Sequence, residues 1–205
     1  MKAIDDFSST SLTLIEKRLR EAPKERVASD AREAAVLISL VSNAGVPSIL
    51  FTKRTETVGT HKGQVSFPGG MRDESDEDAI QTALRETHEE IGIVPTDILV
   101  LGRFHEMPAI TNVRVKSIVG FLGEVDLQSL QVSKAEIDEV FLISLRDLLD
   151  PSRRAERTYE RRGTKGSFPI FKAGPHPVWG LTALITRRFL TEILGQTFAP
   201  ALLDV

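Results

Sequence analysis

The sequence predicts an α/β or α+β sandwich built on a mixed β-sheet. Strand-like segments outnumber helical segments, and the two kinds follow one another in an irregular order. That order differs from the regular strand and helix alternation of a doubly wound sheet. The length of 205 residues suits one domain with a sizeable core.

The composition argues against several classes of function. There are 26 Lys and Arg against 29 Asp and Glu, so the net charge is −3, which argues against bulk electrostatic binding of nucleic acid or anionic membrane. The absence of cysteine excludes disulfides, thiolate catalysis and cysteine-ligated zinc, and it fits a reducing compartment. No apolar run approaches the length of a membrane helix or a signal peptide. We therefore expect a cytoplasmic protein without membrane or nucleic-acid partners.

The N-terminal segment is predicted to be a short amphipathic helix. Apolar residues recur near helical spacing between Thr10 and Glu21, and Pro23 follows. We expect residues 1–30 to form an N-terminal helical extension and residues 31–205 to form the main domain.

Runs of apolar and β-branched residues between turn signals predict the strands. These runs are 34–41, 48–51, 64–67, 98–104, 113–122 and 140–143, with a hairpin from 157–161 and 168–171. A closing helix is predicted over 181–194. Trp179 precedes that helix and is expected in the core, the alternative being an indole that stacks on a base.

The strongest helical pattern runs from Asp76 to Ile91, where apolar residues recur at i, i+3, i+4 and i+7. Ser75 and Asp78 have the spacing of a capping box at its start. Gly92 suits the left-handed position that ends a helix. These signals predict one long helix that begins at residue 76.

Three carboxylates lie together on this helix. Glu86, Glu89 and Glu90 stand at i, i+3 and i+4, so they share a face that differs from the apolar face and should point toward solvent. Such carboxylates repel one another unless a cation neutralises them, and oxygen donors without His or Cys suit Mg²⁺ or Mn²⁺. Gly70 could add a backbone carbonyl ligand, and Arg85 could pair with an acid and hold a glutamate in place. The alternative, a solvated pair of surface glutamates, explains Glu89 and Glu90 alone but not the whole pattern.

The segment from Gly70 to Ile93 resembles the Nudix box, which runs Gly, five residues, Glu, seven residues, Arg-Glu-apolar-x-Glu-Glu-x-Gly-apolar. The resemblance implies the α/β/α sandwich of Nudix hydrolases and a pyrophosphatase that cleaves a nucleoside diphosphate linked to another group. It also implies that Glu86 and Glu90 are the principal metal ligands, with Glu89 as a further ligand or a residue that positions water.

Two positions depart from the box. The spacing from Gly70 to Arg85 is one residue longer, so the first acidic position falls on Asp76 or on Glu77. Either acid could therefore pair with Arg85. Thr87 replaces the usual apolar residue.

Three separated segments resemble the coenzyme A pyrophosphatase branch of the family: 50–55 (LFTKRT), 63–70 (GQVSFPGG) and 178–183 (VWGLTA). The resemblance implies that the substrate is coenzyme A or a derivative, and that the products are 3′,5′-ADP and 4′-phosphopantetheine or its acyl form. Gly59 stands where the branch has a second arginine.

Coenzyme A carries phosphates, so a site that binds it needs cationic side chains. Arg54, His61 and Lys62 lead toward the box and could contact these phosphates, the alternative being surface positions. A general base could come from the box or from the acids of residues 136–139, among which we select Glu136, the alternative again being ordinary loop acids.

Other interpretations stay open. The arginine-rich stretch from Arg153 to Lys165 could hold a 3′-phosphate or RNA, or could be a solvated face. The substrate could instead be a dinucleotide polyphosphate, a nucleotide sugar or capped RNA, and the protein could be a catalytically silent ligand sensor. A monomer or a homodimer is expected.

Overall fold

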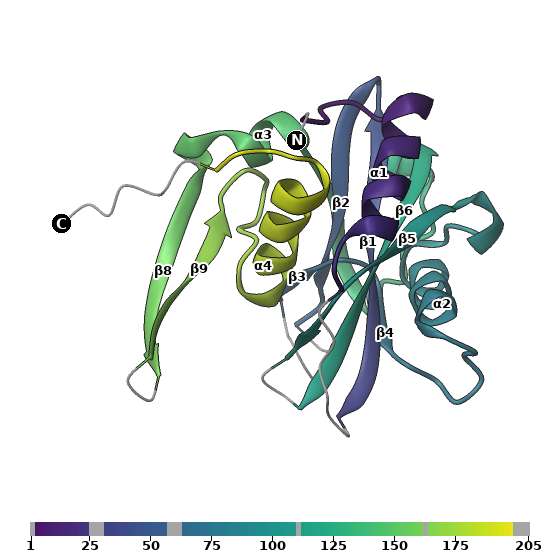
Figure 1. Ribbon diagram of the computed structural model, residues 1–205. Coiled ribbons are helices and arrows are strands. Elements are labelled where there is room, and N and C mark those ends of the chain that lie inside the picture. The colour runs from purple at the N-terminus through teal and green to yellow at the C-terminus, as the bar shows by residue number, and fades with distance from the viewer. Residues whose placement is uncertain (1–2, 25–30, 57–62, 110–111, 162–163, 199–205) are drawn as a thin grey trace.

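The computed structural model describes residues 3–24, 31–56, 63–109, 112–161 and 164–198, without the side chains of 159–161 and 164–166 (Figure 1). The helices of the described residues are α1 (Ser9–Glu21), α2 (Ala79–Ile91), α3 (Leu145–Leu149) and α4 (Gly180–Arg188), which the π-helical turn η4 (Phe189–Ile193) continues. The strands are β1 (Arg32–Asn43), β2 (Val46–Arg54), β3 (Val65–Ser66), β4 (Gly69–Met71), β5 (Leu99–Pro108), β6 (Val113–Glu124), β7 (Ile137–Ser144), β8 (Arg154–Arg161) and β9 (Thr164–Phe171).

In the described part of the chain, the central sheet has seven strands and is mixed. Its order is β3-β2-β1-β6-β5, with β4 paired to β1 and β7 paired to β2. The β1 and β6 strands run parallel, and the other neighbours within this sheet are antiparallel. The α2 helix covers one face, and α1 and α4 cover the other (Figure 1). The predicted sandwich with a mixed sheet is confirmed.

Two apolar clusters fill the space between the sheet and its helices. Successive residues of β1 point to opposite faces, so Leu37 joins the cluster beneath α2 while Ile38 joins the cluster beneath α1 and α4. Both side chains are fully buried. The sheet therefore separates α2, the helix that carries the carboxylates, from α1 and α4 on the opposite face.

The start of α2 differs from the prediction. The helix begins at Ala79, because Asp78 is the N-cap and accepts hydrogen bonds from two amides of the first turn at 2.8 and 3.0 Å. Ser75 takes no part in a capping box, since its hydroxyl donates to Asp73 at 2.7 Å. Asp76 consequently lies in the loop before the helix, where it can reach the side of α2.

Three further features bear on the predictions. Gly92 ends α2 at a φ of 78°, as predicted. Gly69 and Gly70, which lie outside every predicted strand, form part of β4 beside β1. The prediction that Trp179 is a core residue is wrong, because it is the N-cap of α4 and is 47% exposed.

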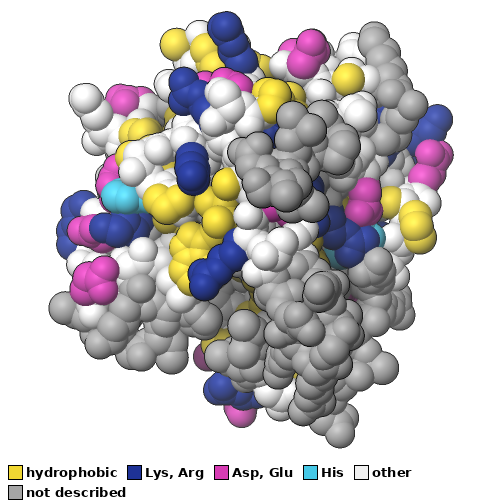
Figure 2. All heavy atoms as spheres, turned by 90° about the vertical axis from the view of Figure 1, so that its left-hand side faces the viewer, with side chains coloured by type: hydrophobic (Ala, Val, Ile, Leu, Met, Phe, Trp, Pro, Cys, Tyr) yellow, Lys and Arg dark blue, Asp and Glu magenta, His cyan; other side chains and the backbone are white. Residues whose placement is uncertain are grey.

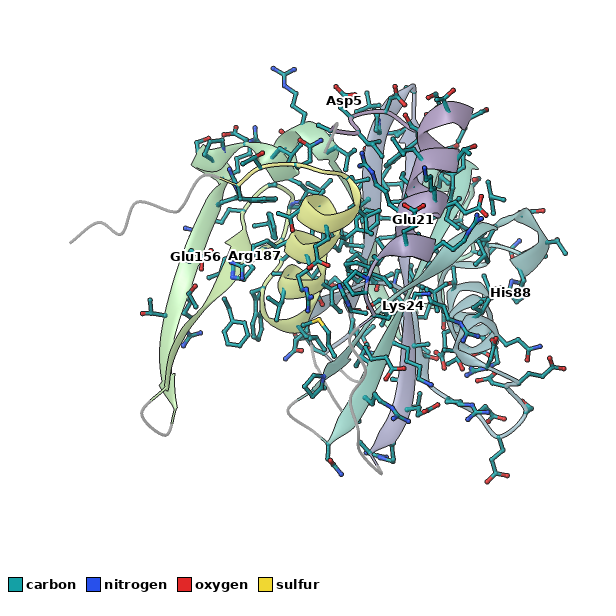
Figure 3. The ribbon with its side chains drawn as sticks, viewed as in Figure 1. Asp5, Glu21, Lys24, His88, Glu156 and Arg187 are labelled. Carbon is teal, nitrogen blue, oxygen red and sulfur yellow. The ribbon has the colours of Figure 1, made fainter. Side chains whose placement is uncertain are left out.

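The β8–β9 hairpin stands outside the central sheet, next to α4. Glu156 of β8 and Arg187 of α4 point toward one another and form an ion pair at 3.0 Å (Figure 3). On the described part of the face that carries the hairpin, basic side chains are interspersed with acidic and apolar ones (Figure 2). None of the described helices is long and apolar enough to cross a membrane.

The N-terminal segment is tied to the C-terminal turn. The Ile4 amide donates to the Leu194 carbonyl at 2.7 Å, and the Arg18 guanidinium donates to the Ile193 carbonyl at 2.6 Å. Ile15 of α1 is fully buried in the larger cluster. We therefore propose that residues 3–24, the described part of the predicted extension over residues 1–30, contribute to the core of the main domain.

Replacing Ile15 with Ala tests this proposal. Removal of a fully buried branched side chain should lower the free energy of unfolding by about 3 kcal/mol. Urea denaturation of Ile15→Ala measures the loss, and Lys17→Ala, an exposed change on the same helix, should stay within about 0.5 kcal/mol of the original protein. A loss below about 1 kcal/mol in Ile15→Ala would mean that α1 is peripheral.

Candidate active site

Asp76 is the acid that Arg85 holds. Its two carboxylate oxygens accept from Nε and Nη2 of Arg85 at 3.0 and 2.9 Å, and Oδ2 also accepts from the Asp73 amide at 2.9 Å. Asp76 is buried, whereas Glu77 is exposed. The Arg85 guanidinium lowers the pKa of Asp76 to about 2. The longer box loop therefore places Asp76, and not Glu77, against Arg85.

Arg85 also links β4 to the acids of α2. Its Nη2 donates to the Met71 carbonyl at 3.0 Å, and its Nη1 lies 2.9 Å from both Glu86 and Glu89. Because Asp76 fixes the guanidinium from the loop side, these glutamates lie beside an immobilised cation. Glu89 is half exposed, while Glu86 is largely buried.

Glu90 does not face solvent, so that expectation is wrong. Its side chain is 1% exposed and lies between the helix and β4, where Oε2 accepts from the Gly69 amide at 3.2 Å. Its other oxygen accepts from Arg54 Nη1 at 3.0 Å. Burial raises the pKa of Glu90 to about 8, against the opposing influence of Arg54 and the Gly69 amide. Without a metal, this carboxyl is the most poorly solvated acid of the site.

Gly70 is close to Glu86. A Cβ atom at residue 70 would lie 2.4 Å from the carboxyl carbon of Glu86, so a larger residue would push the carboxylate away. Burial raises the pKa of Glu86 as well. The glycine thus leaves room for a carboxylate directly against β4.

Arg54, predicted to contact substrate, lies within the acid cluster. Besides Glu90 it approaches Glu136, with Nη2 and Oε2 3.6 Å apart. Of the acids within residues 136–139, all of them described, the structure brings only Glu136 to this cluster. Asp138 instead pairs with Lys53 and Glu139 with His176, each at 2.7 Å.

Some predicted positions lie elsewhere. His61, Lys62 and Gly59 fall outside the described residues, so their predicted roles are untested. His88 is exposed on α2 and points away from the sheet (Figure 3).

Sequence reasoning missed two backbone groups of the site. The Gly69 amide donates to Glu90, and the Met71 carbonyl accepts from Arg85. Both belong to β4, whose glycines let α2 approach the backbone closely. A glycine pair just before a helix with acids was the signal that could have indicated this contact.

The donor set fits a divalent cation in its chemistry. Among the residues that the structure describes, five acids gather around the guanidinium groups of Arg54 and Arg85: Asp76, Glu86, Glu89, Glu90 and Glu136. Three negative charges are thus uncompensated when all groups are ionised, and every donor is a hard oxygen. No three acids of the described residues are arranged so that they could bind one metal ion together. The arginines already donate to the glutamates. Glu86, Glu89, Glu90 and the Gly70 carbonyl are the groups that could hold a metal here.

Comparisons with known proteins show the family and the fold. The NUDIX domain family matches residues 31–162. The chain is 38% identical to the mitochondrial coenzyme A diphosphatase NUDT8 of Homo sapiens, over 91% of this chain and 80% of that protein. It is 40% identical to NUDT8 of Mus musculus, over 86% and 85%. A MutT/nudix family protein from Enterococcus faecalis has a similar fold, with a TM-score of 0.53 and 18% identity over 94% of this chain and 82% of that one.

The pH dependence of the stability of Asp76→Asn tests whether Asp76 anchors Arg85. The folded-state pKa of Asp76 is lowered from 3.8 to about 2, so its ionised form stabilises the fold above pH 4, and this contribution is lost as the pH falls toward 2. The variant should therefore be less stable by about 2 kcal/mol at pH 7, and the difference should shrink below pH 4. Thermal unfolding between pH 7 and pH 3 measures this, with Glu77→Gln as the matched control. An equal loss at both pH values would contradict the anchor.

Proposed function

The chain belongs to the NUDIX domain family, and from that membership we propose that this Nudix pyrophosphatase cleaves the diphosphate of coenzyme A or its derivatives. The products are 3′,5′-ADP and 4′-phosphopantetheine or its acyl form. The observation that carries the substrate assignment is the similarity to coenzyme A diphosphatases over most of both chains. The proposed reaction adds water to one phosphorus while the bond from that phosphorus to the bridging oxygen breaks.

Nudix hydrolases generally need divalent metal ions, and we propose Mg²⁺ or Mn²⁺ here. Glu86, Glu89, Glu90 and the Gly70 carbonyl are the proposed ligands. When bound, the ion polarises phosphoryl oxygens and lowers the pKa of a bound water. The excess of carboxylates over guanidinium groups supports this assignment.

Other side chains receive proposed roles from their positions. Arg85 is a positioning residue, since Asp76 anchors it while it holds Glu86 and Glu89. Glu136 is half exposed beside the cluster and could take the proton of the attacking water. Arg54 is proposed to contact the substrate diphosphate.

His61 and Lys62 are proposed to contact the substrate phosphates. A monomer or a homodimer is proposed for the assembly. The cytoplasmic location stays a prediction, and both coenzyme A diphosphatases above are named as mitochondrial.

Product analysis tests the function. Incubation with coenzyme A and Mg²⁺ or Mn²⁺ should release 3′,5′-ADP and 4′-phosphopantetheine, detected by mass spectrometry, and EDTA should abolish the release. Glu86→Gln should lower kcat by on the order of 10²-fold or more, because it removes a proposed ligand of the metal ion that stabilises the developing negative charge.

Glu77→Gln, an exposed change in the neighbouring loop, is the control and should retain activity. If a dinucleotide polyphosphate, a nucleotide sugar or capped RNA has a higher kcat/KM than coenzyme A, that compound replaces coenzyme A as the proposed substrate. No cleavage of any of these compounds would favour a silent ligand sensor.

A further inference from the structure

Arg54 makes an unusual pair of contacts for a residue expected to bind substrate. Its Nη1 is 3.0 Å from Glu90, and its Nη2 is 3.6 Å from Glu136. Within the described part of the chain, these two acids are the ion-pair partners of its guanidinium, which is 21% exposed. The residue thus bridges α2 and the segment before β7.

The contact compensates a charge that would otherwise be costly. The Glu90 side chain is 1% exposed, and besides Arg54 it accepts from the single amide of Gly69. A buried carboxylate that loses its cation destabilises a fold strongly. Arg54 therefore supplies part of the positive charge that the metal-free cluster needs.

Arg85 is held differently from Arg54. Buried Asp76 grips Arg85 with both oxygens, and the Met71 carbonyl adds a third contact. Arg54 has no comparable anchor among the residues that the structure describes, since both acids on its guanidinium belong to the cluster itself. A cation that enters the cluster would leave Arg85 in place but would meet Arg54 at Glu90.

We propose that Arg54 is an internal cation that competes with the divalent metal for Glu90. A metal at about 2.1 Å from the Glu90 oxygen that accepts from Arg54 would take the place of that hydrogen bond, and the two cations would repel one another. Metal binding therefore displaces Arg54, and the displaced guanidinium becomes available to a substrate phosphate. This inference rests on the proposed role of Glu90 as a metal ligand.

The proposal predicts a direction that a purely structural role does not. Loss of the Arg54 charge should tighten metal binding, whereas loss of a structural support would weaken it or leave it unchanged. Isothermal titration calorimetry with Mn²⁺ alone, without substrate, measures the dissociation constant in Arg54→Gln. We expect about a tenfold tighter Kd, since the metal no longer replaces a charge-assisted hydrogen bond.

Two further variants sharpen the test. Lys53→Gln removes a positive charge from the neighbouring residue, which is equally exposed at 22% and pairs with Asp138 outside the cluster, so it controls for a general loss of charge. Its Kd should stay close to that of the original protein. Arg54→Lys keeps the charge without the forked geometry and should tighten binding less than Arg54→Gln, which keeps the test usable if the Gln variant folds poorly.

Thermal unfolding supplies a second readout. In EDTA, Arg54→Gln should have a lower Tm than the original protein, and saturating Mn²⁺ should reduce that deficit. An unchanged or weaker Kd in both Arg54 variants, or an equal Tm deficit with and without Mn²⁺, overturns the proposal. Absence of Mn²⁺ binding in every variant would overturn the metal assignment and the competition together. Tighter binding without cleavage of coenzyme A would support the competition and refute only the proposed substrate.

Discussion

The contact between Arg85 and Asp76 determines how the acids of α2 are arranged. Asp76 lies in the loop before the helix, is buried, and holds the guanidinium with both oxygens. From that fixed position Arg85 reaches Glu86 and Glu89 on the helix and the Met71 carbonyl on β4. One cation thus joins the loop, helix and strand that form the site.

The rest of the site follows from the crowding of carboxylates around few cations. The close approach of α2 to β4 depends on two glycines, one that leaves room for Glu86 and one whose amide donates to Glu90. Burial raises the pKa of both glutamates, which makes the cluster receptive to further positive charge. Arg54, which lies on β2, supplies part of this positive charge, and a divalent ion would supply more.

The sequence predicted the elements better than their contacts. Periodicity located α1, α2 and most strands, because one-sided burial leaves a repeating pattern. It misplaced the start of α2, because Asp78 as well as Ser75 has a side chain that can cap a helix. It could not choose between Asp76 and Glu77, because that choice depends on the conformation of the loop before α2. It could not place Glu90 in the interior, because that burial depends on how closely β4 approaches the helix. Trp179 was misassigned because a residue before an apolar helix can lie outside the packed face.

Anomalous diffraction from crystals soaked in Mn²⁺ tests the central claim, that this acid cluster is built to hold a divalent cation. We expect a peak about 2.1 Å from carboxylate oxygens of Glu86 and Glu90, with Glu89 or the Gly70 carbonyl nearby and Arg54 turned away from Glu90. A peak elsewhere, or no peak with both arginines still on the glutamates, would contradict it.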